Sequence, residues 1–204
     1  MDILTEAISI LPYVFARSQD ENFEEIQDDF IDWMENYAKV YQSNYRSNQK
    51  GYQSPDDFYL DKSFAPFLNY MSERILALVE TYKKHDDVEI DFIPRLSNMW
   101  FNINYKGCAN RQHHHPNSLH SGVYYIKTPN NSGDICFPNP NQTIYWGWPG
   151  GLHEKSNQLN SGIVSLTPQK NILFIFPSWA NHSVDPNLSD EPRISLSFNT
   201  GIIQ

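Results

Sequence analysis

Three consecutive histidines, His113, His114 and His115, are the residues of this sequence best suited to chemistry. Along an extended backbone successive side chains point to opposite faces, so His113 and His115 share a face and His114 points the other way. Two imidazoles on one face offer two nitrogen ligands to a divalent metal, and a third from a neighbouring strand would complete the set. Taken alone, the tripeptide fits a solvated, histidine-rich polar loop equally well.

His182 is the candidate for the third ligand, because it follows an apolar run that ends in FPSW at 176–179. The alternative is a surface histidine, or one whose hydrogen bonds are satisfied in the core. The residues DPNLSD at 185–190 are typical of a turn, so the flanking segments are expected to pair as a hairpin. Such a hairpin places His182 opposite Arg193.

Arg193 opens the run RISLSF, in which polar and apolar residues alternate, so that Arg193 and Ser195 share one face. A guanidinium inside a barrel requires an anion, and its planar fork suits a carboxylate held by two parallel hydrogen bonds. A metal at His182 and Arg193 on the adjacent strand could therefore hold opposite ends of a short diacid. The alternative is an ordinary ion pair of Arg193 with the acidic residue at position 190 or 191.

The elements that must position these residues change in type along the chain. Apolar residues recur every three or four positions over 21–42 and 63–84, which predicts two amphipathic helices. After residue 86, short β-branched and aromatic runs bounded by Gly, Pro and Asn predict strands. The predicted strands cover residues 98–105, 122–127, 134–137, 163–166, 171–176, 180–184 and 192–200. This order predicts an α+β fold, with N-terminal helices packed on the sheet of a β-sandwich or barrel.

Length and composition narrow the class of protein. A chain of 204 residues predicts a single domain over 1–204, with a helical part at about 1–86 and a β-rich core at about 87–204. The net charge of −9, without a basic stripe, argues against a nucleic-acid partner. The apolar runs are too short to span a membrane, no secretory signal is recognisable, and the two cysteines fit reduced thiols. We therefore expect a cytoplasmic protein; the sequence gives no oligomeric state.

The chain contains, in order, the motifs W-x-N at 100–102, Gly107, H-x-H-P at 113–116, SGVYY at 121–125, G-x-I-x-F at 133–137 and R-x-S-x-S-F-N at 193–199. This ordered set resembles a family of 2-oxoglutarate- and Fe(II)-dependent oxygenases that occurs in marine bacteria and their phages. GYQS at 51–54 also resembles the N-terminal signature of that family, so the resemblance runs from about residue 40 to the C-terminus. It implies a double-stranded β-helix, which is a jelly-roll, cupin-like fold.

The resemblance implies an iron site. His113 or His115 would supply the proximal ligand and His182 the distal one, so we take His113, His115 and His182 as the predicted metal ligands. The usual face in such oxygenases is two histidines and one carboxylate in His-x-Asp/Glu order, whereas here the second position is His115. Asp134, on a neighbouring strand, is the alternative source of a carboxylate.

The resemblance also implies a cosubstrate site. Arg193 and Ser195 would hold the distal carboxylate of 2-oxoglutarate. Tyr124 is a further candidate for this pocket, because it and its neighbour Tyr125 lie on a predicted strand that could line it. Aromatic residues on strands also serve as ordinary core.

The activity implied by the resemblance is that of a dioxygenase. It would consume 2-oxoglutarate and O2, release succinate and CO2, and hydroxylate a small-molecule or peptide substrate. The alternatives are a metal site that uses no keto acid, in a zinc hydrolase or a cupin-like oxygenase, and a carbohydrate-binding jelly roll whose Trp-rich loop at 145–151 stacks on sugars. Arg193 discriminates between them, because only the 2-oxoglutarate enzyme needs an inward cation near the metal histidines.

Overall fold

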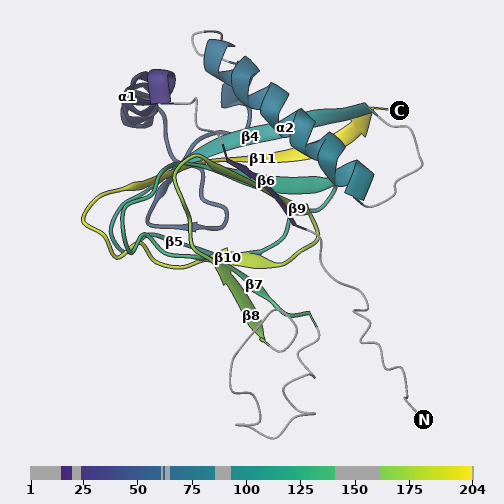
Figure 1. Ribbon diagram of the computed structural model, residues 1–204. Coiled ribbons are helices and arrows are strands. Elements are labelled where there is room, and N and C mark those ends of the chain that lie inside the picture. Colours follow the sequence, from purple (N-terminus) through teal and green to yellow (C-terminus); the bar gives the residue numbers. More distant parts are fainter. Residues whose placement is uncertain are drawn as a thin grey trace, which may run out of the picture.

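Two antiparallel sheets face each other in the computed structural model, which describes residues 15–19, 24–60, 62, 65–85, 93–140 and 161–203. Helices α1 (Glu24–Val40) and α2 (Ala65–His85) lie over the larger sheet, on the side away from the smaller one (Figure 1). The larger sheet has the strand order β1-β9-β6-β11-β4-β3, and the smaller sheet has the order β2-β5-β10-β7-β8. Among the described residues no helix is long and apolar enough to cross a membrane.

The strands divide between the sheets as follows. The larger sheet contains β1 (Ala16–Gln19), β3 (Tyr52–Gln53), β4 (Ile93–Asn104), β6 (His120–Lys127), β9 (Ile172–Pro177) and β11 (Arg193–Ile203). The smaller sheet contains β2 (Asn48–Gln49), β5 (Ala109–His113), β7 (Ile135–Pro138), β8 (Ile163–Leu166) and β10 (His182–Val184). A short 3-10 helix, η1, covers Phe58–Leu60.

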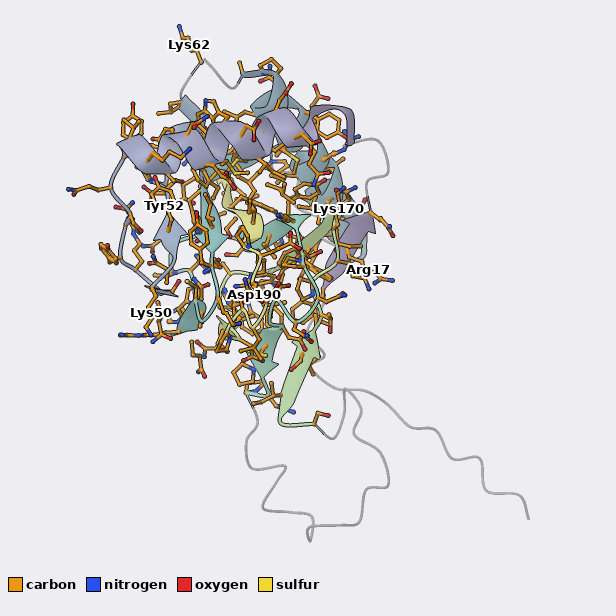
Figure 2. The ribbon with its side chains drawn as sticks, turned by 90° about the vertical axis from the view of Figure 1, so that its left-hand side faces the viewer. Arg17, Lys50, Tyr52, Lys62, Lys170 and Asp190 are labelled. Atoms are coloured by element: carbon orange, nitrogen blue, oxygen red, sulfur yellow. The ribbon has the colours of Figure 1, made fainter. Side chains whose placement is uncertain are left out.

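The alternation along β11 gives this strand one apolar face and one polar face. Ile194, Leu196 and Phe198 are fully buried in the cluster that packs under the helices. The helices contribute fully buried side chains of their own to this cluster, such as Phe30 from α1 and Met71 from α2. Figure 2 shows side chains filling this layer, while charged groups such as Lys62 lie at the periphery. The polar residues of β11 therefore face the other way, into the space between the sheets.

The α+β class and the double-stranded β-helix are confirmed; α1 lies within its predicted range, and α2 ends one residue beyond its own. All seven predicted strands are present, with ends shifted by up to five residues, as at the start of β4. The sequence did not indicate β1, β2, β3 and β5. The strands β2 and β3 have two residues each, and β5 (ANRQH) is polar, so none of these three shows an apolar pattern that would identify it.

The predicted hairpin between His182 and Arg193 is wrong. Strand β10 pairs with β5 and β7 in the smaller sheet, whereas β11 pairs with β4 and β6 in the larger sheet. The segment between them crosses from one sheet to the other because Asn187 anchors it. The Asn187 side chain is fully buried and donates hydrogen bonds to the carbonyls of Asn104 and Glu191, both at 2.8 Å. Its backbone exchanges hydrogen bonds with Gly107 and Cys108, in the turn that also crosses between the sheets.

Gly122 on β6 offers a test of the packing under the helices. A Cβ atom at this position would collide with the Phe198 ring and with the Phe174 carbonyl oxygen. We expect Gly122→Ala to lower the free energy of unfolding by about 3 kcal/mol, the upper end of the usual cost of overpacking. Gly107→Ala is the control, because open space surrounds it and only its φ of 79° opposes a side chain, at about 1 kcal/mol. Urea titration measures the free energy of unfolding of both variants. An equal loss in the two would contradict the close packing of Gly122 against Phe198.

Candidate active site

Three imidazoles converge at one end of the two-sheet interior. His113 ends β5 and pairs in register with His182 at the start of β10. His115 lies two residues beyond β5, where its backbone N–H donates to the Ser178 carbonyl at 2.9 Å. One ring nitrogen of each of these histidines lies within 4.8 Å of the others, and His114 is exposed. The structure thus brings together the three predicted metal ligands and leaves His114 outside.

Backbone carbonyls orient two of the three rings. Nδ1 of His182 lies 3.0 Å from the Ala180 oxygen, and Nδ1 of His113 lies 2.7 Å from the Arg111 oxygen. A carbonyl can only accept, so each Nδ1 carries the proton and each Nε2 keeps its lone pair for a ligand. The Nε2 atoms of His115 and His182 are 3.4 Å apart. The His115 ring also stacks on Trp100, with a centroid distance of 5.5 Å.

Burial keeps these imidazoles neutral. It lowers the pKa of His182 to about 3 and that of His115 to about 4, and the neighbouring histidines add to both shifts. The pKa of His113 is lowered by the same cause. Neutral imidazole is the form that binds a metal, so no proton has to leave at neutral pH before binding.

Arg193 is buried between the sheets with an exposed fraction of 1%. Its Nη1 donates to the carbonyls of Ser132 and Gly133, and burial lowers the pKa of its guanidinium. The acidic neighbours do not pair with it: Asp190 binds Lys106 at 2.6 Å and Glu191 binds Lys127 at 2.9 Å. Among the described residues no carboxylate forms an ion pair with Arg193, which removes the alternative interpretation of this residue.

Arg193 shares one cavity with the histidines, which we call the inner pocket. Asn104 pairs with Arg193 and Asn102 pairs with Ser195, so these polar groups lie side by side across β4 and β11. The Nδ2 of Asn104 and the Oδ1 of Asn102 are buried and have no hydrogen-bond partner among the described residues. Such atoms cost about 1–3 kcal/mol each unless a ligand or water supplies the missing partner. The inner pocket is lined by Asn102, Asn104, His113, His115, Tyr125, His182, Arg193 and Ser195, among others.

The structure does not bring Tyr124 to the inner pocket. Tyr124 points to the helix side, where its hydroxyl lies 3.3 Å from Oδ1 of Asn171, and Tyr125 lines the pocket instead. Burial raises the pKa of Tyr125. Asp134 is not part of the histidine cluster, and no described carboxylate joins it. The Trp-rich segment at 145–151 lies outside the described residues.

Asn104 is a pocket residue that sequence reasoning missed. Its signal was present in the spacing of 98, 100, 102 and 104 on one face of a predicted strand, where three positions are Asn. Alternation places these residues on the same face as Arg193 once the register Arg193↔Asn104 is known. That register cannot be obtained from β4 alone.

Several solved structures share the fold of this chain. The epimerase SnoN from nogalamycin biosynthesis, a non-heme α-ketoglutarate-dependent enzyme, aligns with a TM-score of 0.65 at 14% identity over 91% of this chain and 75% of its own. A prolyl hydroxylase from Trichoplax adhaerens, bound to a peptide of hypoxia inducible factor, gives 0.63 at 13% identity over 91% and 82%. HygX from Streptomyces hygroscopicus, bound to nickel, 2-oxoglutarate and hygromycin B, gives 0.61 at 12% over 92% and 82%. No curated protein matches the chain.

The fold is therefore that of the 2-oxoglutarate-dependent oxygenases. The model of a 2OG-Fe(II) oxygenase family matches residues 98–199, and the chain belongs to this family. It is an oxygenase that depends on Fe(II) and 2-oxoglutarate. The residues present fit both groups: three neutral imidazoles offer nitrogen ligands, and a buried guanidinium that pairs with no described carboxylate offers a place for an anion.

Removal of one imidazole tests the metal centre. We expect His182→Ala to weaken Fe(II) binding by more than about 100-fold, because losing a direct ligand costs more than losing an outer hydrogen bond. His114→Ala is the matched control and should bind normally, since that ring is exposed. Anaerobic titration with iron analysis measures both. Full iron stoichiometry in His182→Ala would mean that the third ligand lies elsewhere.

The low pKa values predict how stability depends on pH in chelator-treated protein. The pKa of His182 is about 3 when folded against 6.5 when unfolded, so the unfolded chain binds more protons below pH 6.5. Stability should therefore be complete above that pH and fall on acidification, by about 1.4 kcal/mol per pH unit for each such imidazole. Urea unfolding between pH 7 and 5 measures the slope, and His182→Asn should make it shallower. A flat profile in the parent protein would contradict the burial of these rings.

Proposed function

We propose that the three imidazoles of His113, His115 and His182 hold Fe(II), and that Arg193 and Ser195 hold the distal carboxylate of 2-oxoglutarate. The enzyme then hydroxylates a small-molecule or peptide substrate, releasing succinate and CO2. Bound Fe(II) supplies the activation of O2 for this chemistry. The observation that carries the proposal is the guanidinium of Arg193, which is buried in the same cavity as the three histidines and has no described carboxylate partner.

Charge supports this assignment. Three neutral imidazoles leave the full 2+ charge on a bound Fe(II), and Arg193 adds a further positive charge in the same enclosed space. A dianion with two carboxylates complements this pair better than a monoanion or a neutral molecule. The amide of Asn104, whose Nδ2 has no partner in the described part of the chain, supplies another donor in the same pocket.

The walls of the inner pocket support a role in excluding water. Tyr125 and Phe176 are both buried and line it, and Trp100 lies over His115. An apolar wall strengthens the electrostatic interaction between Arg193 and a carboxylate and protects reactive species from solvent. This arrangement favours the oxygenase over a zinc hydrolase or a sugar-binding jelly roll, because neither of these needs an inward guanidinium.

We also propose that residues 1–204 form one domain that works in the cytoplasm on a substrate other than nucleic acid or membrane. The packing of α1 and α2 on the larger sheet supports one domain. The free, buried thiols of Cys108 and Cys136 support a reducing compartment. The net charge of −9 disfavours a nucleic-acid partner.

Replacing the buried cation tests the cosubstrate assignment. We expect Arg193→Met to weaken 2-oxoglutarate binding by about 100-fold or more while Fe(II) binding persists, because the variant leaves a carboxylate unpaired at about 2–5 kcal/mol. Anaerobic titration, followed through the visible band of the chelated keto acid, measures both equilibria. Lys127→Met is the control: it removes a more exposed cation at the end of the neighbouring strand β6, and it should have little effect on 2-oxoglutarate binding.

The parent protein supplies the outcome that would contradict the proposal. Absence of the visible band at saturating Fe(II) and 2-oxoglutarate would favour the zinc or carbohydrate-binding alternatives. Unchanged 2-oxoglutarate affinity in Arg193→Met would show that the distal carboxylate binds elsewhere.

A further inference from the structure

We propose that a second cleft beside the histidines is the substrate site, and that it takes an anion bearing an amide group, such as an N-acylated amino acid with a free carboxylate. We call this cleft the outer groove. It has a volume of about 420 Å³ and is lined by the 46–56 segment, the middle of β4, residues 111–118 and Asn199. The inference rests on the proposed function, because it names the substrate class for the same metal centre.

The outer groove and the inner pocket meet at the candidate metal centre. His113, His115 and Trp100 line both cavities, whereas Arg193 lines only the inner pocket and Arg111 only the outer groove. A molecule in the outer groove therefore contacts the same imidazoles as a molecule in the inner pocket. With the inner pocket assigned to 2-oxoglutarate, the outer groove remains for the substrate.

Gln53 brings to the outer groove a carboxamide that has no hydrogen-bond partner in the described part of the chain. It has an exposed fraction of 5%, lines the groove, and its carboxamide forms no hydrogen bond within the described part of the chain. Strand pairing with Asn102 fixes its backbone beside the inner pocket. A buried carboxamide needs both an acceptor and a donor, and an amide group of a ligand provides both. An apolar substrate would leave both needs unmet.

Two other amides of the groove, the buried Asn199 and the half-buried Asn98, have hydrogen-bond partners in the described part of the chain, whereas the Gln53 carboxamide has none. Asn199 donates from Nδ2 to Oδ1 of Asn98 at 2.7 Å, and its own Oδ1 accepts from the Ser121 hydroxyl at 2.6 Å. Asn98 in turn donates from Nδ2 to Oδ2 of Asp56 at 3.4 Å. This chain fixes the wall of the groove and leaves the Gln53 carboxamide available to a ligand.

The charges of the outer groove favour an anion. Its one lining carboxylate, Asp56, pairs with Arg46 at 3.3 Å. Arg111 also lines the groove and forms no ion pair among the described residues. Its guanidinium therefore adds one positive charge that no described carboxylate of the groove neutralises. This positive charge stands against a chain net charge of −9. A guanidinium binds a carboxylate through two parallel hydrogen bonds, which gives both charge and orientation.

Substrate screening with the Fe(II)-loaded enzyme and 2-oxoglutarate tests the proposal. The probes are a pool of N-acetyl amino acids, the methyl esters of the same compounds, a pool of medium-chain fatty acids and a pool of neutral sugars. We expect succinate release above the substrate-free rate with the N-acetyl amino acids, and lower activity with their esters. Stimulation by the fatty acids or the sugars alone would overturn the proposal, and so would no stimulation by any pool.

Variants of the groove then test the residues. With the best N-acetyl amino acid, Arg111→Glu should raise KM at least about 10-fold, and this penalty should shrink to about twofold with the methyl ester. Gln53→Leu should lower kcat/KM by about 10-fold or more, and Gln53→Glu, which keeps the shape, should also lower it. Arg95→Glu makes the same charge change outside the groove and is the control. Values of KM and kcat/KM that are equal for the parent, Arg111→Glu and both Gln53 variants would overturn the proposal.

The visible band that forms with Fe(II) and 2-oxoglutarate shows whether a failure concerns the substrate site or the proposed function, because this band forms without substrate. If the band forms in the parent protein and in the groove variants, a failure of the screening belongs to the outer groove alone. If the band does not form in the parent protein, the proposed function fails and the substrate assignment fails with it.

Discussion

The buried positive charge of Arg193 is the constraint on which the rest of the site depends. Taking an ion out of water costs several kcal/mol, and two backbone carbonyls offset only part of that cost. These carbonyls belong to residues 132 and 133, in a turn where Gly133 has a φ of 87° and where a Cβ atom would collide with the Asp185 backbone. A turn before β7 in the smaller sheet thus holds a side chain from the larger sheet, and the guanidinium retains a need for an anion.

The sequence could predict which residues face the interior because that depends on local geometry. Alternation in RISLSF put Arg193 and Ser195 on one face, and alternation through the three histidines separated His114 from its neighbours. The periodicity of the helices was equally informative. Each helix buries one face against the larger sheet, and apolar residues that recur every three or four positions mark that face in the sequence. Each of these patterns is complete within a few residues, so no knowledge of distant partners is needed.

Other features depend on contacts between distant segments. The position of Arg193 across from the histidines, instead of on the adjacent strand, follows from Asn187 binding the turn at 107–108. The sequence SGVYY could not show which tyrosine faces the pocket, since β6 is covered on both faces and almost all of its residues are buried. Gln53 belongs to a two-residue edge strand, and only its pairing with Asn102 reveals that it approaches the site.

The central claim is that a guanidinium between the sheets recognises the carboxylate remote from the metal. Calorimetric titration of the Fe(II)-loaded protein without oxygen, with 2-oxoglutarate and with 2-oxopentanoate, tests it most directly. The two acids share a carbon chain and a chelating end, and differ in the distal carboxylate. A dissociation constant at least about 100-fold larger for 2-oxopentanoate is the result expected of a buried charge pair. Equal dissociation constants for the two acids would contradict the claim.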